Sequence, residues 1–285
     1  MCPARYRMVA MQPRTLLLIL VACCGMSAQT PKDIQRGQTK ELQQLIARAN
    51  GGDASAQYTL GLRYGAGTGV PKDYAEGARW LRKAAEQGMG RAQYTLGMMY
   101  ANGQGVMKDA AEAAKWVTKA AEGGDPVAQT TVGVLYESGQ GVEQNDAEAA
   151  NWYKKAIENY RKTADEGDAS AATALGNMYA RGQGVIGDYS EAAGWWRKAA
   201  DTGYPGAQYN LGLAYARGRG VPEDQVQAYL WLSLAAANKG EGQERRAKSR
   251  DEVASKLTAD QLTEGKRLVA EWKPKAKTPP SGEAK

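Results

Sequence analysis

Residues 56–88 read AQYTLGLRYGAGTGVPKDYAEGARWLRKAAEQG, and this stretch decides the fold because its pattern recurs along the chain. Its Leu-Gly-x-x-Tyr core, centred on Gly61, returns four times, with Val in place of Leu in the third copy. The recurring glycines are Gly97, Gly133, Gly176 and Gly212. Their spacings from Gly61 onward are 36, 36, 43 and 36 residues, and a Gly-x-Gly-Val loop follows each core. Five copies at a nearly constant period indicate a repeat architecture.

The first half of each unit predicts a helix. Ala56, Leu60, Gly61 and Tyr64 recur at helical spacing, which places them on one buried side. A glycine on that side allows a second helix to approach closely. We expect this helix, helix A, to end at Gly67, because a left-handed C-cap residue is most often glycine.

The second half of each unit predicts another helix, helix B, with a capping box at its start. The pairs are Asp73/Glu76, Asp109/Glu112, Asn145/Glu148, Asp188/Glu191 and Asp224/Gln227. Such acidic pairs also occur as general acid and base, but capping explains their spacing without any chemistry.

A tryptophan recurs within helix B, beside alanines that permit close contact, at Trp80, Trp116, Trp152, Trp195 and Trp231. An aromatic column can stack sugars or bases, yet its return at one helix position favours packing between helices. The sequence 182–187 also fits the Gly-x-Gly-x-x-Gly dinucleotide pattern. A dinucleotide site needs a strand before the loop, whereas a helix is expected here, and the last glycine is missing from the other units.

Composition excludes several kinds of chemistry. The chain has no histidine, so imidazole bases and ligands are absent, and its cysteines, Cys2, Cys23 and Cys24, all precede the repeats. We therefore expect no metal site and no cofactor. The net charge is +6, but part of it lies in the leader and part after Lys239. No basic stripe for a nucleic acid is visible.

Residues 1–28 are typical of a secretory signal peptide, because basic residues precede a short apolar run, 16–22. That run is too short to span a membrane, which takes about 20 residues. Two processing sites fit: a lipobox ending at Cys23, whose thiol would carry the lipid, and an ordinary cleavage before Gln29. Translation could also start at Met8 or Met11. The protein is thus predicted to be exported, as a periplasmic protein, an outer-membrane lipoprotein or a secreted protein.

The combined pattern A-x-x-x-L-G-x-x-Y, G-x-G-V-x-x-D and A-x-x-W-x-x-K-A-A resembles the Sel1-like repeat over residues 53–240. The resemblance extends to a closing segment that ends near Trp272. It implies an all-α fold, a right-handed α-solenoid of Sel1/TPR-like helix-turn-helix repeats. Around five repeats we expect a linker and capping helix in 29–52, with the helix at 41–50, capping helices in 241–272, and a disordered tail in 273–285.

One departure from the period stands out, the spacing of 43 between Gly133 and Gly176. Tyr153-Lys154-Lys155 is echoed seven residues later by Tyr160-Arg161-Lys162. A duplicated heptad lengthens a helix by about two turns and keeps its buried face nearly in phase. We therefore expect a longer helix B in unit three, and a bend or stagger of the superhelix there.

Helix A also has an outward column, opposite its buried side. If helix A lines the concave face, as the resemblance implies, this column forms a groove for a protein or peptide partner. The predicted partner-binding residues are Tyr58, Leu62, Tyr94, Met98, Asn177, Arg181, Tyr209 and Arg217. They suit a peptide with apolar anchors and an acidic end. In the alternative, some of them contact only neighbouring units.

Sel1-like families are generally adaptors, so the sequence predicts an exported interaction scaffold and not an enzyme. A binder of envelope polysaccharide or cell wall is the main alternative. A hydrolase of the β-lactamase-like Sel1 type is less favoured, because paired cysteines, histidine and an S-x-x-K motif are all missing. No nucleic-acid partner is expected, and membrane contact is expected only through a lipid on Cys23.

Overall fold

The computed structural model describes residues 31–275, with side chains from Thr39 onward. The predicted signal peptide, both cleavage sites and Cys23 lie outside these residues. Within them the chain forms thirteen helices and no strand. These are α2 (Pro31–Asn50), α3 (Ala54–Ala66), α4 (Tyr74–Glu86), α5 (Gly90–Asn102), α6 (Ala110–Glu122), α7 (Pro126–Ser138), α8 (Asp146–Asp165), α9 (Ala169–Arg181), α10 (Tyr189–Ala200), α11 (Pro205–Arg217), α12 (Gln225–Ala237), α13 (Gln243–Ala254) and α14 (Ala259–Glu271).

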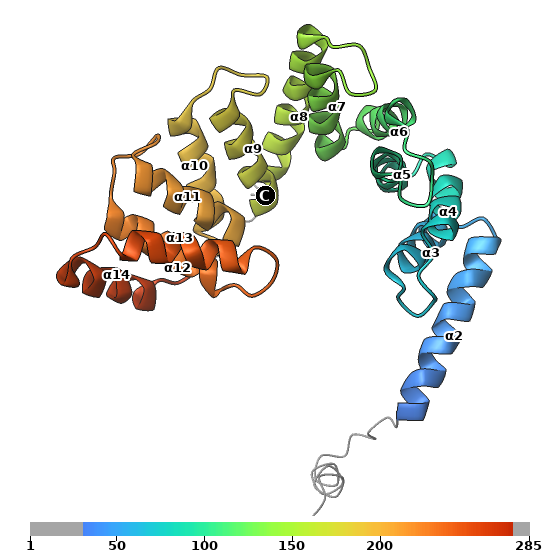
Figure 1. Ribbon diagram of the computed structural model, residues 1–285, viewed down its shortest axis with the longest axis horizontal. Coiled ribbons are helices and arrows are strands. Elements are labelled where there is room, and N and C mark those ends of the chain that lie inside the picture. The colour runs from blue at the N-terminus through green and yellow to red at the C-terminus, as the bar shows by residue number, and fades with distance from the viewer. Residues whose placement is uncertain (1–30, 276–285) are drawn as a thin grey trace, which may run out of the picture.

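The helices α3 to α12 make five helix-turn-helix units, and each unit packs on the next. The ribbon forms an arch, with α7 and α8 at the top, α2 at one end and the α12–α14 group at the other (Figure 1). This is an all-α solenoid of helix-turn-helix repeats, as the sequence predicts.

The glycine loops end helix A as predicted. Gly67 is the C-cap of α3 with φ 73°, in the left-handed region that glycine adopts without a Cβ penalty. The second loop glycine has another role. Gly105, also at positive φ, lies so close to the preceding unit that a Cβ would overlap the Tyr74 carbonyl group. The loop therefore joins two helices and also fixes the contact between two units.

Helix B starts with the predicted N-cap, but the reciprocal half of the capping box is wrong. The Asp73 carboxylate accepts hydrogen bonds from the Ala75 and Glu76 amides at 2.9 and 3.0 Å. The Asp73 amide donates to the Tyr64 carbonyl of helix A at 2.9 Å, so it is not free for Glu76, which pairs with Arg79 instead. The same backbone bond closes the other units, and a full capping box forms at Thr258 and Gln261 in α14.

The tryptophan column packs between units. Trp116, for example, belongs to a cluster with Ala78 and Leu81 of the preceding unit. A lysine one turn later covers the ring, with Lys119 Nζ 4.5 Å from its centroid. Unit four differs, because Trp195 is only half-buried and the adjacent Trp196 is buried.

Helix α8 has 20 residues where α4 and α6 have 13, so the predicted lengthening of this helix is confirmed. The stacking shows how the stagger arises. The loop glycine Gly141 lies against Ala110, the first residue of α6, whereas its counterpart Gly184 lies against Tyr153, one heptad into α8. Unit four is therefore displaced along α8 by about 10 Å, as expected for seven helical residues.

Both ends of the solenoid are closed by helices. Helix α2 begins at Pro31, earlier than the 41–50 helix expected from the sequence, and proline is compatible with a first helical turn. At the other end α14 packs on α12, where the Trp272 and Trp231 rings meet edge-on at 6.3 Å. The tail expected to be disordered from Lys273 is held at its start, since Lys275 Nζ lies 2.6 Å from Asp201 Oδ2. Residues 276–285 lie outside the described part.

Candidate partner-binding groove

The inner side of the arch carries the first helix of the N-terminal units. In Figure 1, α3 and α5 lie toward the inside of the arch, and α4 and α6 lie toward the outside. The side of helix A that turns away from helix B is therefore the side on which a bound segment would lie. By helical spacing, the predicted outward column lies opposite the buried Ala56, Leu60 and Gly61 of helix A.

In units one to three this column offers apolar side chains. Leu62 is 42% exposed and Val134 is 40% exposed, and neither belongs to a core cluster of these units. Met98, between them in the series, is half-buried. An accessible apolar strip along helix A is suited to contact with another molecule.

The three predicted tyrosines are half-buried in the packing between units. Tyr58 packs against a cluster formed by α4 of its own unit and α5 and α6 of the next unit. The Tyr94 hydroxyl lies 3.5 Å from Thr131 Oγ1, and the Tyr209 hydroxyl lies 3.3 Å from Ser249 Oγ in the C-terminal cap. Each therefore helps to stack units and leaves only part of its ring for a partner. Thr173, which holds the same position in unit four, is buried, and Gly206 of α11 lies beside it.

Units four and five bring three predicted residues into one cleft of about 400 Å³. Asn177 and Arg181 come from α9, Arg217 comes from α11, and Leu213 adds an apolar wall. The other polar members of the lining were not predicted from the sequence, and they are Tyr189, Trp196, Asn210 and Arg219.

A fixed amide lies at the centre of this cleft. Asn177 Oδ1 accepts hydrogen bonds from Trp196 Nε1 at 3.1 Å and from Asn210 Nδ2 at 2.8 Å. Because both acceptor sites of the oxygen are used, the Asn177 amino group is left to donate elsewhere. In the sequence, this arrangement is indicated by two residues of unit four that differ from the repeat pattern. Asn177 replaces an apolar residue of the outward column, and Trp196 replaces the residue that faces the helix A glycine.

The charge of the lining is positive. Arg181, Arg217 and Arg219 contribute guanidinium groups, and no carboxylate lines the cleft. Arg219 lies over the Tyr189 ring at 5.5 Å and donates to its hydroxyl at 3.5 Å. Within the described chain, Arg181 and Arg217 form no hydrogen bond or ion pair through their side chains.

Tyr153 lies near Arg181, and its hydroxyl binds the carboxylate of Glu137. Burial, chiefly, and the hydrogen bond to Glu137 Oε2 at 2.6 Å raise the pKa of Tyr153 above its usual value, while the Arg181 charge opposes this shift. Glu137 is thereby engaged by a neutral tyrosine hydroxyl, and it is not part of the cleft lining.

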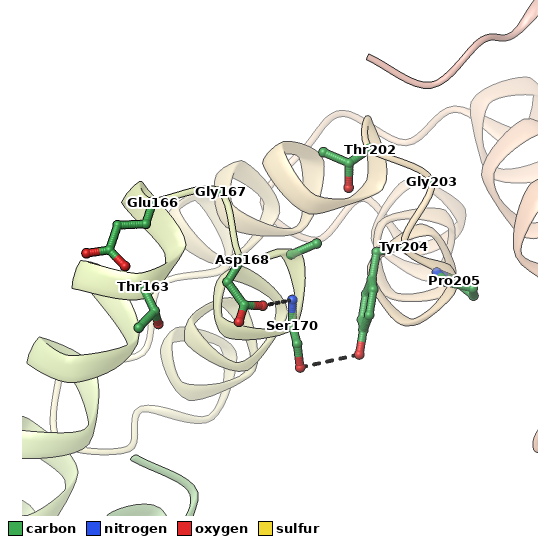
Figure 2. A pocket seen from close by; sticks show the side chains of 10 residues that line it. Thr163, Glu166, Gly167, Asp168, Ser170, Thr202, Gly203, Tyr204 and Pro205 are labelled. Atoms are coloured by element: carbon green, nitrogen blue, oxygen red, sulfur yellow. Dashed lines mark hydrogen bonds between the residues drawn. The ribbon is translucent and has the colours of Figure 1, made fainter. Parts of the chain in front are cut away.

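A larger cavity, of about 610 Å³, lies at the turns between units three, four and five (Figure 2). Its polar side chains other than Glu166 form hydrogen bonds within the fold. Asp168 accepts from the Ser170 amide at 2.7 Å as the N-cap of α9, and the Tyr204 hydroxyl donates to Ser170 Oγ at 3.4 Å. None of the sequence-predicted site residues lines this cavity.

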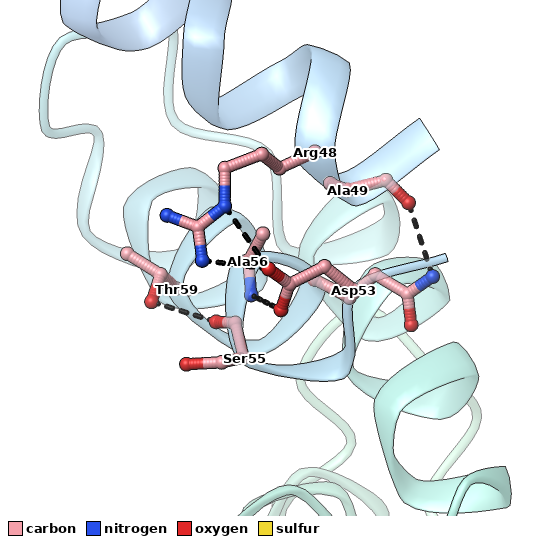
Figure 3. Close-up of polar contacts among 7 residues, drawn as sticks. Arg48, Ala49, Asp53, Ser55, Ala56 and Thr59 are labelled. Carbon is pink, nitrogen blue, oxygen red and sulfur yellow. Dashed lines mark hydrogen bonds and ion pairs between the residues drawn. The ribbon is translucent and has the colours of Figure 1, made fainter. Parts of the chain in front are cut away.

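Another polar cluster at the start of α3 also serves the fold (Figure 3). Asp53 caps the helix through the Ala56 amide and pairs with Arg48 at 2.6 Å. These bonds, that to Ala56 first, lower the pKa of the Asp53 carboxyl. The buried Gln57 donates to the Ala49 carbonyl, and Gln93, Gln129 and Gln208 repeat this bond to the preceding helix. The sequence analysis missed this glutamine column, whose signal was an Ala-Gln pair at the start of helix A in four units.

Across residues 39–275, whose side chains the structure describes, no three His, Cys, Asp or Glu side chains gather as metal ligands would. No helix in the same range combines the length and apolar character that crossing a membrane requires.

The fold and the groove define the class of protein as a helical-repeat solenoid with an accessible inner face. The Sel1 repeat profile matches residues 54–89, 90–125, 126–160, 154–168, 169–204 and 205–239, and the chain belongs to the Sel1 repeat family. The six matches correspond to five helix pairs, because 126–160 and 154–168 overlap within the lengthened α8. Proteins of this family are generally scaffolds for protein–protein interaction and are typically not enzymes.

Two solved structures are similar over most of the chain. A Sel1 repeat protein from Oxalobacter formigenes is 33% identical, with a TM-score of 0.56, over 76% of this chain and 87% of that one. The protein c5321, a protective antigen of uropathogenic Escherichia coli, is 32% identical with a TM-score of 0.50. This chain is covered to 81% in that comparison and spans 55% of the longer relative. Among curated proteins, none matches the chain.

Proposed function

We propose that this protein is an exported scaffold that binds a segment of a partner protein along the inner side of its arch. The observation that carries the proposal is that Arg181 and Arg217, two arginines without an ion-pair partner in the described part of the chain, lie in one cleft. They belong to the same outward column of helix A as the exposed Leu62 and Val134. Aliphatic and guanidinium groups left accessible on one face are typical of interaction surfaces. The residues that line the cleft include no serine, cysteine or carboxylate, which suits binding better than catalysis.

Replacing Leu62 and Val134 together by glutamate tests the groove. Both side chains are exposed, so the double variant should fold normally, while burying two carboxylates under a partner is costly. We expect capture of the native partner, measured by crosslinking in the native envelope, to fall strongly. The matched control is Met107→Glu with Ile186→Glu, because these residues are 87% and 92% exposed on loops.

Equal partner capture by both double variants would exclude the groove as the binding site. A glycan pulldown with the same variants addresses the polysaccharide alternative. Retention on a cell-wall or envelope polysaccharide that depends on Leu62 and Val134 would favour that function over protein binding.

Export rests on the leader, 1–28, and a lipid anchor on Cys23 is the finer form of this proposal. The residue after Cys23 is not aspartate, so in a diderm host the lipoprotein is expected in the outer membrane. Metabolic labelling with a palmitate analogue should give a signal that Cys23→Ala removes. A mature N-terminus at Gln29 without labelling would show that the protein is released by ordinary signal peptidase.

A further inference from the structure

We infer that the cleft formed by α9, α10 and α11 binds the side-chain carboxylates of an acidic segment in the partner protein. This inference rests on the proposed function and adds to it the chemistry that the partner must present. The partner segment carries at least two Asp or Glu residues, with an aliphatic residue beside them.

The charge of the cleft complements carboxylates. Three guanidinium groups line a space of about 400 Å³ that has no carboxylate in its wall, and Arg181 and Arg217 have no anionic partner within the described chain. Guanidinium groups bind carboxylates in bidentate geometry, so an incoming acidic side chain can meet two donors at once. A single carboxylate would leave most of this positive charge uncompensated, which is why the segment needs more than one.

The orientation of the Asn177 amide also favours a carboxylate ligand. Its carbonyl oxygen accepts hydrogen bonds from Trp196 and Asn210, at 3.1 and 2.8 Å, so its amino group is available as a hydrogen-bond donor. A fixed donor among arginines complements an acceptor-only ligand such as a carboxylate. Neither Asn177 nor Trp196 follows the pattern of its position in the repeat. At the position of Asn177, the other units have Leu62, Met98, Val134 and Leu213. At the position of Trp196, they have Leu81, Val117, Tyr153 and Leu232.

The lining of the cleft favours a peptide over an acidic sugar chain. Sugar binding commonly uses an open aromatic face, but Arg219 lies over the Tyr189 ring, which is 39% exposed, and the Trp196 ring is buried. The remaining wall, formed by Ala180, Leu213 and Ala214, is aliphatic and suits a Leu or Val side chain of a peptide. Units one to three have Ala66, Asn102 and Ser138 at the position of Arg181 and Arg217, so the positive charge is confined to this part of the groove.

The experiment uses the full mature chain and two fluorescein-labelled peptides with both ends blocked, an oligoglutamate and an oligoglutamine. We expect the oligoglutamate to bind by fluorescence anisotropy, with an affinity that falls as salt rises. Arg181→Gln with Arg217→Gln should lower its affinity about tenfold or more, as expected for charged contacts at a binding centre. Both arginines are exposed, so circular dichroism and the melting temperature should stay unchanged.

The matched control is Arg91→Gln with Lys162→Gln, which removes the same charge from exposed positions outside the cleft. An equal loss of affinity in this control would overturn the inference, since the effect would come from net charge alone. Failure of the wild-type protein to distinguish oligoglutamate from oligoglutamine would also overturn it. Equally strong, arginine-dependent binding of oligogalacturonate would show that the cleft accepts an acidic polysaccharide, and the peptide assignment would be wrong.

The inference can fail separately from the proposed function. If capture of the native partner requires Leu62 and Val134 but is unchanged in the Arg181/Arg217 double variant, the groove binds a protein and the carboxylate assignment is wrong. If neither pair affects capture, the proposed groove itself is wrong.

Discussion

The five glycines of helix A set the distance between the two helices of each unit. A Cβ at Gly61 would lie 2.7 Å from Leu81 Cγ, and a Cβ at Gly176 would lie 2.5 Å from Trp196 Cδ1. The facing residue ranges from valine to tryptophan, yet the close approach is kept in every unit. The missing side chain therefore fixes the packing, and the partner residue fills what space remains.

Gly97→Ala tests this packing. The new Cβ would meet Val117 Cγ2 at 2.6 Å and the Ala113 carbonyl at 3.1 Å, so the two helices must separate. We expect the free energy of unfolding to fall by about 1–3 kcal/mol in urea titrations, as for overpacked cores. Gly194→Ala is the matched control, because Gly194 lies within α10 and an added Cβ would have nothing within 4 Å. This substitution should stabilise the protein by about 0.5–1 kcal/mol. Stabilisation by both substitutions would contradict the close-approach argument.

Tyr160 predicts an alkaline limit to stability. Burial raises the pKa of its phenol from 10.0 to about 12. A raised pKa in the folded state means that the stabilisation is complete below pH 10.0 and is lost as the pH rises through about 12. Tyr160→Phe keeps the ring and removes the titrating group, so its urea stability should depend less on pH in that window. Identical pH profiles for the two proteins would exclude Tyr160 as a source of alkaline lability.

The role of a residue could be predicted from the sequence where the same residue type recurs at the same position of each unit. The capping aspartates and the αL glycines follow local rules, so their roles are visible in the sequence. The partner of the Asp73 amide is not, because the Tyr64 carbonyl becomes available only after the chain has turned back. Asn177 and Trp196 were visible only as exceptions, and their hydrogen bond depends on how two helices pack.

At the scale of elements, α8 shows how an insertion can be accommodated without breaking a solenoid. Seven residues at about 100° each return the helix to within about 20° of its starting phase, so the same face stays buried. Ile157 and Tyr160 of the extra heptad are accordingly buried. The heptad echo in the sequence predicted this length, while the direction of the displacement needed the contact between Gly184 and Tyr153.

Deleting residues 154–160 should restore an ordinary unit. The junction would then read Trp152-Tyr153-Arg161-Lys162, which matches Trp80-Leu81-Arg82-Lys83 of unit one. We expect a folded protein with undiminished cooperativity and a changed small-angle scattering profile, because units four and five would no longer be displaced. Partner capture should fall if the segment contacts both halves of the groove.

Deleting 154–161 is the control for phase. One further residue rotates the second part of α8 by about 100° and turns its buried side toward solvent. This variant should lose much of its stability in thermal unfolding. Equal stability of the two deletions would mean that α8 does not need its phase, contrary to the packing described here.

At the scale of the whole molecule, the two halves of the arch present different surfaces. The N-terminal half exposes Leu62 and Val134, and the C-terminal half carries the arginine cleft. The lengthened α8 lies between them and sets their separation. The repeat pattern predicted the solenoid itself, because every unit carries the same local signals. The cleft was predicted only in part, since its lining is drawn from three helices and one loop whose contacts are not periodic.

Each unit of a solenoid contacts mainly its neighbours, so stability should be lost from the ends inward. The last units depend on the C-terminal cap, where Trp272 packs edge-on against Trp231 at 6.3 Å. Trp272→Ala should therefore lower hydrogen-exchange protection in α11 and α12 by up to about 2 kcal/mol, and leave α3 to α6 unchanged. Because α11 lines the cleft, the same variant should weaken oligoglutamate binding although Trp272 is not among the lining residues. Lys266→Ala, at an exposed position of α14, should change neither measurement. A uniform loss of protection from α3 to α14 would instead indicate that the five units unfold as one cooperative body.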